Sequence, residues 1–166
     1  KVNVDVKPES RIVIRTNLAL AYASQGDTDV AKKILATIAI ANDKSPYVKL
    51  SQAWLKAADK DYLGAVNLLN QIIELDSSFT PAYEYKGNML FATSDMQGAA
   101  TAYGHFVEAH PQAHKTRMMY SLALVNAENY VEAEKQASKL LQLFPNQPLV
   151  NQIKAQARFY EKDYEN

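Results

Sequence analysis

An aspartate or asparagine recurs in this chain every 34 residues, which is the separation of Asp27 from Asp61. The five positions are Asp27, Asp61, Asp95, Asn129 and Asp163. The first four are each followed, four residues later, by an alanine, at Ala31, Ala65, Ala99 and Ala133. A fixed step of this length indicates a stack of small repeated units, none of which can bury its apolar face alone. The sequence therefore predicts an array of helical repeats.

The two series also predict how each unit is built. An aspartate or asparagine side chain can accept a hydrogen bond from the free amide groups in the first turn of a helix, so each of these positions is expected to begin a helix. An alanine one turn later is expected where two helices cross closely, because a larger side chain would push them apart. Each unit is therefore expected to contain two helices.

Apolar and small residues occur at helical spacing around these positions. In the third unit, the apolar residues of the second helix are Met96, Ala99, Tyr103, Phe106 and Val107. Small residues recur in the first helix of each unit, as Ala19, Ala53, Gly87, Ser121 and Ala155. Glycine inside a helix costs about 1 kcal/mol relative to alanine, so Gly87 predicts a close contact between helices. Pro111 and Pro145 are expected to end the second helix of their units.

These features resemble the tetratricopeptide repeat (TPR), a helix-turn-helix unit of about 34 residues. The third unit carries the family pattern of aromatic, small, alanine, aromatic and proline residues as Tyr83, Gly87, Ala99, Tyr103 and Pro111. The resemblance implies an all-α fold, a right-handed TPR superhelix or α–α solenoid, of about nine helices.

The repeat frame divides the chain into units at 12–45, 46–79, 80–113 and 114–147, followed by a half repeat at 148–166. In residues 1–11, valines alternate with polar residues before Pro8, so this stretch is expected to be an extended segment or the tail of a preceding repeat. The sequence starts without methionine and stops inside a motif, so we expect a piece of a longer or processed protein.

The run from Ser121 to Asn166 also resembles the repeats of the large TPR lipoproteins of bacterial PEP-CTERM protein-sorting and exopolysaccharide systems. This resemblance implies a location in the periplasm, with the full-length protein attached to the inner membrane by a lipid. A cytoplasmic location remains the alternative.

Composition excludes several classes of partner and site. Lysine plus arginine equals aspartate plus glutamate at 18 each, so no net charge would attract nucleic acid. The apolar runs are too short to span a bilayer. Cysteine is absent, which excludes disulfides and thiolate metal sites. We expect a protein or peptide as the partner.

No motif for catalysis, a cofactor or a metal stands out. His110 and His114 are four residues apart, but Pro111 between them ends the helix, so the two rings are not expected to share a metal. The chain has neither a GxSxG motif nor a glycine-rich phosphate loop. We expect a protein that is not an enzyme and needs no cofactor, with a hydrolase as the third alternative.

The TPR resemblance implies that the first helices line a concave groove. The candidate partner-binding residues are Leu20, Tyr47, Leu50, Trp54, Glu84, Asn88, Phe91, Met118, Leu122, Asn126, Gln152 and Phe159. They are mostly apolar or aromatic, which favours a peptide or a partner helix laid in the groove. Trp54, the one tryptophan, is the expected hot spot.

Two alternatives to a groove ligand remain at this point. Some of these residues are expected to belong to the core between successive first helices instead of a binding surface. The array would then be a structural spacer or an assembly module. In addition, exposed repeat ends are expected to allow the fragment to associate with itself.

Overall fold

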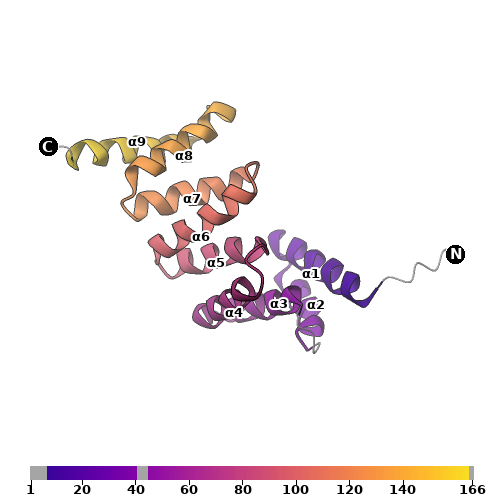
Figure 1. Cartoon of the computed structure of the whole chain (residues 1–166). Helices are drawn as coiled ribbons and strands as arrows, with labels where there is room; N and C mark the ends of the chain where they lie inside the picture. The colour runs from indigo at the N-terminus through magenta and orange to yellow at the C-terminus, as the bar shows by residue number, and fades with distance from the viewer. Residues whose placement is uncertain (1–6, 41–44, 165–166) are drawn as a thin grey trace. The chain divides into compact units, whose positions relative to one another are not determined.

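The computed structural model describes residues 7–40 and 45–164. Within these ranges the chain forms nine α-helices and no strand (Figure 1). The helices are α1 (Pro8–Ser24), α2 (Thr28–Ala39), α3 (Pro46–Ala58), α4 (Tyr62–Leu75), α5 (Pro81–Ala92), α6 (Met96–Ala109), α7 (His114–Asn126), α8 (Tyr130–Leu143) and α9 (Pro148–Tyr164). The predicted all-α fold of paired short helices is confirmed.

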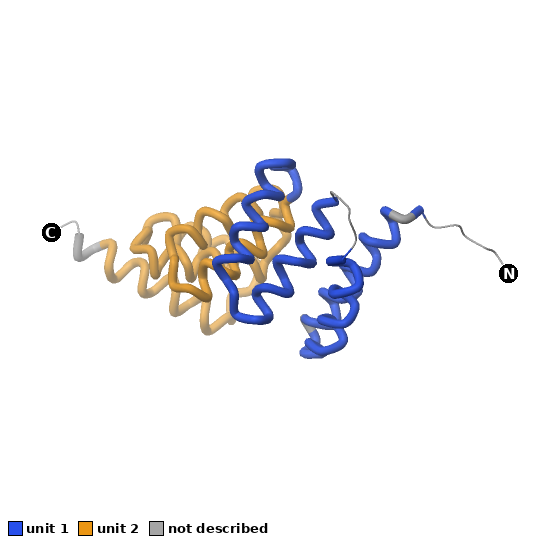
Figure 2. The backbone as a smooth tube through the Cα atoms, turned by 90° about the horizontal axis from the view of Figure 1, so that it is seen from below, with its two compact units in different colours: residues 1–79 blue, residues 80–166 orange. Residues whose placement is uncertain are grey.

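The helices form two compact units, residues 1–79 and residues 80–166 (Figure 2). Within each unit, every helix packs against the next one along the chain. In unit 1, α1 also contacts α3, and in unit 2, α7 also contacts α9. Unit 2 therefore has two layers, which we call the first-helix layer (α5, α7 and α9) and the second-helix layer (α6 and α8).

The helices of each pair are joined by the same tight turn. One residue of the turn has a positive φ, and in the described ranges these residues are Gly26 (94°), Lys60 (66°), Ser94 (65°) and Glu128 (60°). They recur at the same step as the aspartate series, which follows them by one position. Only the first of them is glycine, the residue that adopts this conformation without steric cost.

The aspartate series acts in this turn through its backbone. The Asp95 amide donates to the Leu90 carbonyl at 2.9 Å, and the Ser94 amide donates to the Phe91 carbonyl at 3.1 Å. This pair of bonds is a Schellman motif, which satisfies carbonyl groups at the end of the first helix. The second helix starts at the very next residue, as the sequence predicted for the first four positions of the series.

The predicted side-chain caps form at two of these four positions. Asp61 accepts from the amide of Gly64 at 2.9 Å, and Asp95 accepts from the amide of Gly98 at 2.9 Å. A Cβ atom at Gly98 would lie 2.4 Å from Asp95 Oδ2, so glycine leaves room for the carboxylate to approach the amide.

The other two positions, Asp27 and Asn129, make no side-chain cap, and that part of the prediction was wrong. The residues three positions later are Val30 and Glu132, where the two capped helices have glycine.

Both ends of the array differ from the expectation. Helix α1 begins at Pro8, so residues 8–11 are helical and not extended, while residues 1–6 lie outside the described ranges. Proline is tolerated in the first turn of a helix because its missing amide hydrogen would have no partner there. At the other end, α9 continues through position 163, so the fifth member of the aspartate series does not start a new helix.

The alanine series lies in the core. All four alanines are fully buried, and they pack among apolar residues of the neighbouring helices. Gly87 is also buried, and a Cβ atom at this position would lie 2.6 Å from Cδ1 of Tyr103. The close helix contact predicted from Gly87 is confirmed.

We expect the substitution Glu128→Gly to increase the free energy of unfolding by about 0.5–1 kcal/mol. A residue other than glycine costs about 1–2 kcal/mol in this left-handed conformation, and substitution by glycine removes that cost. Glycine also gives the unfolded chain more conformational entropy, which offsets about 0.5–1 kcal/mol of the gain. Urea denaturation measures the change. The matched control, Gly26→Ala, should lower stability, and equal effects of the two substitutions would contradict the role of the turn.

We expect the Asp61 carboxyl to titrate below pH 3.8 in the folded protein. The hydrogen bond from Lys56 is the main cause of the lowered pKa, and the amide of Gly64 adds to it. Ionised Asp61 therefore stabilises the fold above its ordinary pKa, and this contribution disappears as the pH falls through the folded pKa.

NMR titration of the Asp61 carboxyl carbon tests this prediction. The substitution Lys56→Met should raise the midpoint toward 3.8, whereas Lys49→Met, which removes a lysine that bonds Gln71 instead, should leave it in place.

We expect Gly87→Ala to lower the free energy of unfolding by about 1–3 kcal/mol, as overpacking does in cores. Alanine would ordinarily stabilise a helix interior by about 1 kcal/mol, so the predicted sign is opposite to helix propensity. Thermal denaturation followed by circular dichroism measures the effect. Gly104→Ala is the control, since its Cβ would come no closer than 3.2 Å to the Tyr120 hydroxyl oxygen. Stabilisation by Gly87→Ala would refute the close contact.

Candidate partner-binding site

The structure places the four expected groove residues of unit 1 in different environments. Leu50 is 1% exposed and belongs to the core, so its assignment to a binding surface is corrected. Trp54 is half-buried against the core cluster around Leu35, while Leu20 is also half-buried. The ring of Tyr47 packs edge-on against Phe79, with 5.0 Å between centroids.

In unit 2, two of the expected groove residues are hydrogen-bonded within the fold. Glu84 on α5 accepts from the Thr116 hydroxyl on α7, which joins two helices of the first-helix layer. Asn88 Oδ1 accepts from the Tyr103 hydroxyl at 2.8 Å. Burial and the charge of Glu84 raise the pKa of Tyr103, so this phenol remains a donor at neutral pH.

The other expected residues of unit 2 differ in exposure. Phe91, Met118 and Leu122 are half-buried against the unit 2 core. Asn126 and Gln152 are exposed.

At the far end of the first-helix layer, Phe159 is 63% exposed. Its ring packs edge-on against Tyr160, whose ring stacks on Tyr130 at 5.4 Å between centroids. Phe159 is therefore the most exposed aromatic ring of the predicted set.

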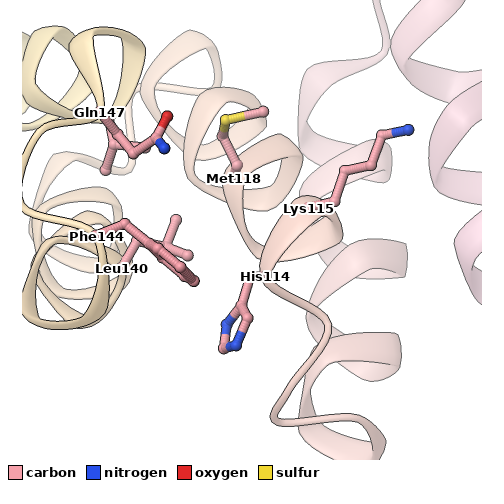
Figure 3. A pocket seen from close by; sticks show the side chains of 7 residues that line it. His114, Lys115, Met118, Leu140, Phe144 and Gln147 are labelled. Carbon is pink, nitrogen blue, oxygen red and sulfur yellow. The ribbon is translucent and has the colours of Figure 1, made fainter.

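One of the predicted residues, Met118, lines a hollow of about 190 Å³ between α7, α8 and α9 (Figure 3). The residues that line it are His114, Lys115, Met118, Leu140, Phe144, Gln147 and Val150. We call this hollow the apolar pocket.

The apolar pocket has a buried floor and a partly exposed aromatic wall. Leu140 and Val150 are 3% and 2% exposed and form the floor, whereas Phe144 is 41% exposed. The Phe144 ring extends toward α7, and the ring of His114 packs edge-on against it at 5.2 Å between centroids. Lys115 is the one charged residue of the lining, and its side chain extends away from Phe144 (Figure 3).

The wall of the apolar pocket also contains an unsatisfied polar atom. Nδ1 of His114 is buried and, among the described residues, is the one buried side-chain nitrogen or oxygen without a hydrogen-bond partner. Such atoms are rare in native structures and call for a physical explanation. The imidazole packs on Phe144, and the backbone amide of His114 donates to the Gln112 carbonyl at 2.9 Å.

The size of the apolar pocket limits what it can hold. Pockets for whole small-molecule ligands usually have volumes of about 300–1000 Å³. A hollow of about 190 Å³ is smaller than this, and it matches one large apolar side chain. The lining residues include neither an acid nor a hydroxyl group.

Sequence reasoning found Met118 but missed the opposite wall of the apolar pocket. Phe144 occupies the thirty-first position of its unit, where the earlier copies have Asn42, Asp76 and His110. An aromatic residue in place of three polar ones was the signal in the sequence. The repeat pattern identifies positions where the units have similar residues, and Phe144 is at a position where its unit differs from the others.

The three histidines lie in separate environments. His110 Nε2 is 2.7 Å from the Thr80 hydroxyl oxygen, and His105 packs beside Tyr83. In the described part of the chain, no group of three or more histidine, cysteine, aspartate or glutamate residues could hold a metal ion.

No helix in the described part of the chain is long and apolar enough to cross a membrane.

Comparison with known proteins agrees with this architecture. Residues 86–148 match the family model described as tetratricopeptide repeat. No curated protein matches the chain.

Solved structures share the fold at low sequence identity. MamA of MSR-1 is 19% identical with a TM-score of 0.73, over 93% of this chain and 89% of that one. MamA from Desulfovibrio magneticus RS-1 is 18% identical with a TM-score of 0.70, over 93% and 87%. A tetratricopeptide repeat protein from Parabacteroides merdae is 17% identical with a TM-score of 0.61, over 94% and 60%.

Proposed function

We propose that this chain, which has the fold of tetratricopeptide repeat proteins, is a non-catalytic scaffold that binds a protein or peptide. In this proposal the first-helix layer of unit 2 is the docking surface, and the apolar pocket receives one large apolar side chain of the partner. The fold supports the general role, because helical repeats present extended surfaces to other proteins.

The observation that carries the proposal is the partly exposed Phe144 above a buried apolar floor. An aromatic side chain at the rim of a small apolar hollow gives a partner side chain a large desolvated contact at low entropic cost. The exposed amides of Asn126 and Gln152 lie on the same first-helix layer and can supply polar contacts to other parts of a partner. Both a partner helix and an extended peptide can present one apolar anchor in this way.

The lining also favours one kind of partner sequence. Lys115 gives the rim a positive charge without a counterpart among the lining residues. A partner with an acidic residue near its apolar anchor would therefore bind better than one with a basic residue there.

We further propose that the scaffold works in a bacterial cell-envelope system for protein sorting or polysaccharide export. The support is the resemblance of residues 121–166 to the TPR lipoproteins of such systems. Fractionation of cells that make the full-length tagged protein tests this placement, and recovery in the cytoplasmic fraction alone would contradict it.

Binding of selected peptides tests the proposed site. Peptides are first selected from a random phage-displayed library on the wild-type chain, and their affinities are then measured by fluorescence anisotropy. We expect Phe144→Ser to weaken binding by about 10- to 100-fold, because burying a large apolar side chain contributes about 1.5–3 kcal/mol.

The matched control is Leu143→Ser, at a neighbouring residue that is 59% exposed and does not line the apolar pocket. It should leave the affinity unchanged, and circular dichroism should show the same helix content for both variants. If no peptide is selected, the array is better described as a structural spacer. If both variants bind the peptides as the wild type does, the apolar pocket is not the binding site.

A further inference from the structure

A second concave region lies in unit 2, on the side of α7 away from the apolar pocket. It consists of two adjoining hollows of about 310 and 250 Å³, lined by α6, α7 and α8, that share Gly104, Glu108 and Tyr120. The larger hollow is polar, and the charged residues that line it are Glu108, Arg117, Glu132, Lys135 and Lys139. We call the larger hollow the basic hollow.

The main feature of the basic hollow is a buried arginine. Arg117 is 8% exposed, and its guanidinium donates to Gln136 Oε1 and, at 3.0 Å, to the carbonyl of Pro111. Both acceptors are neutral. Among the described residues, no carboxylate oxygen lies within 4 Å of this guanidinium. A buried charge is costly unless a countercharge or strong hydrogen bonds compensate it.

The neighbouring acid is already engaged with other groups. Glu132 accepts from Gln136 Nε2 at 2.6 Å and from Lys135 Nζ at 3.0 Å. Burial acts to raise the pKa of Glu132, but these hydrogen bonds and the charges of Lys135 and Lys139 lower it below its ordinary value, so the group is ionised at neutral pH. Glu132 thus neutralises the charge of Lys135 more than it neutralises the charge of Arg117.

The charge balance of the basic hollow leaves a surplus. Three cationic and two anionic side chains line it, which leaves one positive charge. Lys139 is exposed, and no carboxylate in the described part of the chain lies within 4 Å of its ammonium group. The surplus is therefore located near Arg117 and Lys139.

We propose that the basic hollow binds the carboxylate of an aspartate or glutamate side chain on a partner protein. One negative charge matches the surplus, and the planar guanidinium suits a carboxylate. The continuation into the second hollow leaves room for the residues that flank this side chain. The site is separate from the apolar pocket and does not depend on it.

Dianionic phosphate and nucleic acid fit this site less well. Each would bring more than one negative charge beside Glu108 and Glu132, and like charges at this separation repel. The chain also has no net charge that would attract a polyanion.

The test is an NMR titration of the chain with an acetylated, amidated tripeptide that has one glutamate between two alanines. The glutamine tripeptide has glutamine in place of this glutamate. We expect the side-chain signals of Arg117 Nε–H and the Gln136 amide to shift, and the affinity to fall as salt is added. The glutamine tripeptide should cause no such shifts. The substitution Lys139→Met should weaken binding by about two- to fivefold, as loss of an exposed ionic contact does.

The matched control is Lys33→Met, which removes the same charge from an exposed position of α2 that lines none of the three hollows and should leave the affinity for the glutamate tripeptide unchanged. Because Lys139 is exposed, its variant tests the site even if substitution of the buried Arg117 unfolds the chain. The proposal is overturned if the glutamate and glutamine tripeptides cause equal shifts, if both lysine variants lose affinity equally, or if inorganic phosphate shifts the Arg117 signal and the glutamate tripeptide does not.

Discussion

Each helix pair depends on a single backbone conformation at the turn between its helices. A residue with positive φ ends the first helix, and the amide of the next residue bonds back to the carbonyl five positions earlier. The second helix then starts at once, which leaves almost no freedom in how the two helices meet. The fully buried alanine one turn later fits the close contact that this turn imposes. The backbone of the aspartate series therefore forms the turn at all four positions, whereas its side chains cap the second helix at only two of them.

Binding surfaces arise where the chain departs from this repeated plan. Phe144 stands where the other units have a polar residue, and the result is the apolar pocket. Arg117 occupies a position that packs between helices, and it brings a charge into the core with neutral acceptors around it. The first unit has an arginine at the same position, Arg15, but that side chain is exposed, so burial and not residue type distinguishes Arg117. A repeat supplies similar helices in every unit, and each site depends on a residue or an environment found in one unit.

The sequence predicted the fold well because the repeat period and the capping positions are local features. It did not predict which side chains remain exposed. Leu50 is buried although the repeat frame pointed it toward a groove, because its exposure depends on neighbouring helices that are remote in the chain. The caps at Asp27 and Asn129 also failed, although both residues directly precede the second helix of their pair. Local pattern determines the helices, and packing between them determines the site.

The two concave regions of unit 2 share α7 as a common wall, with Met118 on one side and its chain neighbour Arg117 on the other. An α-helix is about 10 Å across with its side chains, so ligands at both places would be held by one rigid rod. A partner that carries both an apolar anchor and an acidic side chain, at a spacing that reaches both regions, would make the second contact intramolecularly and bind more tightly than through either region alone. A scaffold with this arrangement can distinguish a partner that carries both an apolar anchor and an acidic side chain from a partner that carries only one of them.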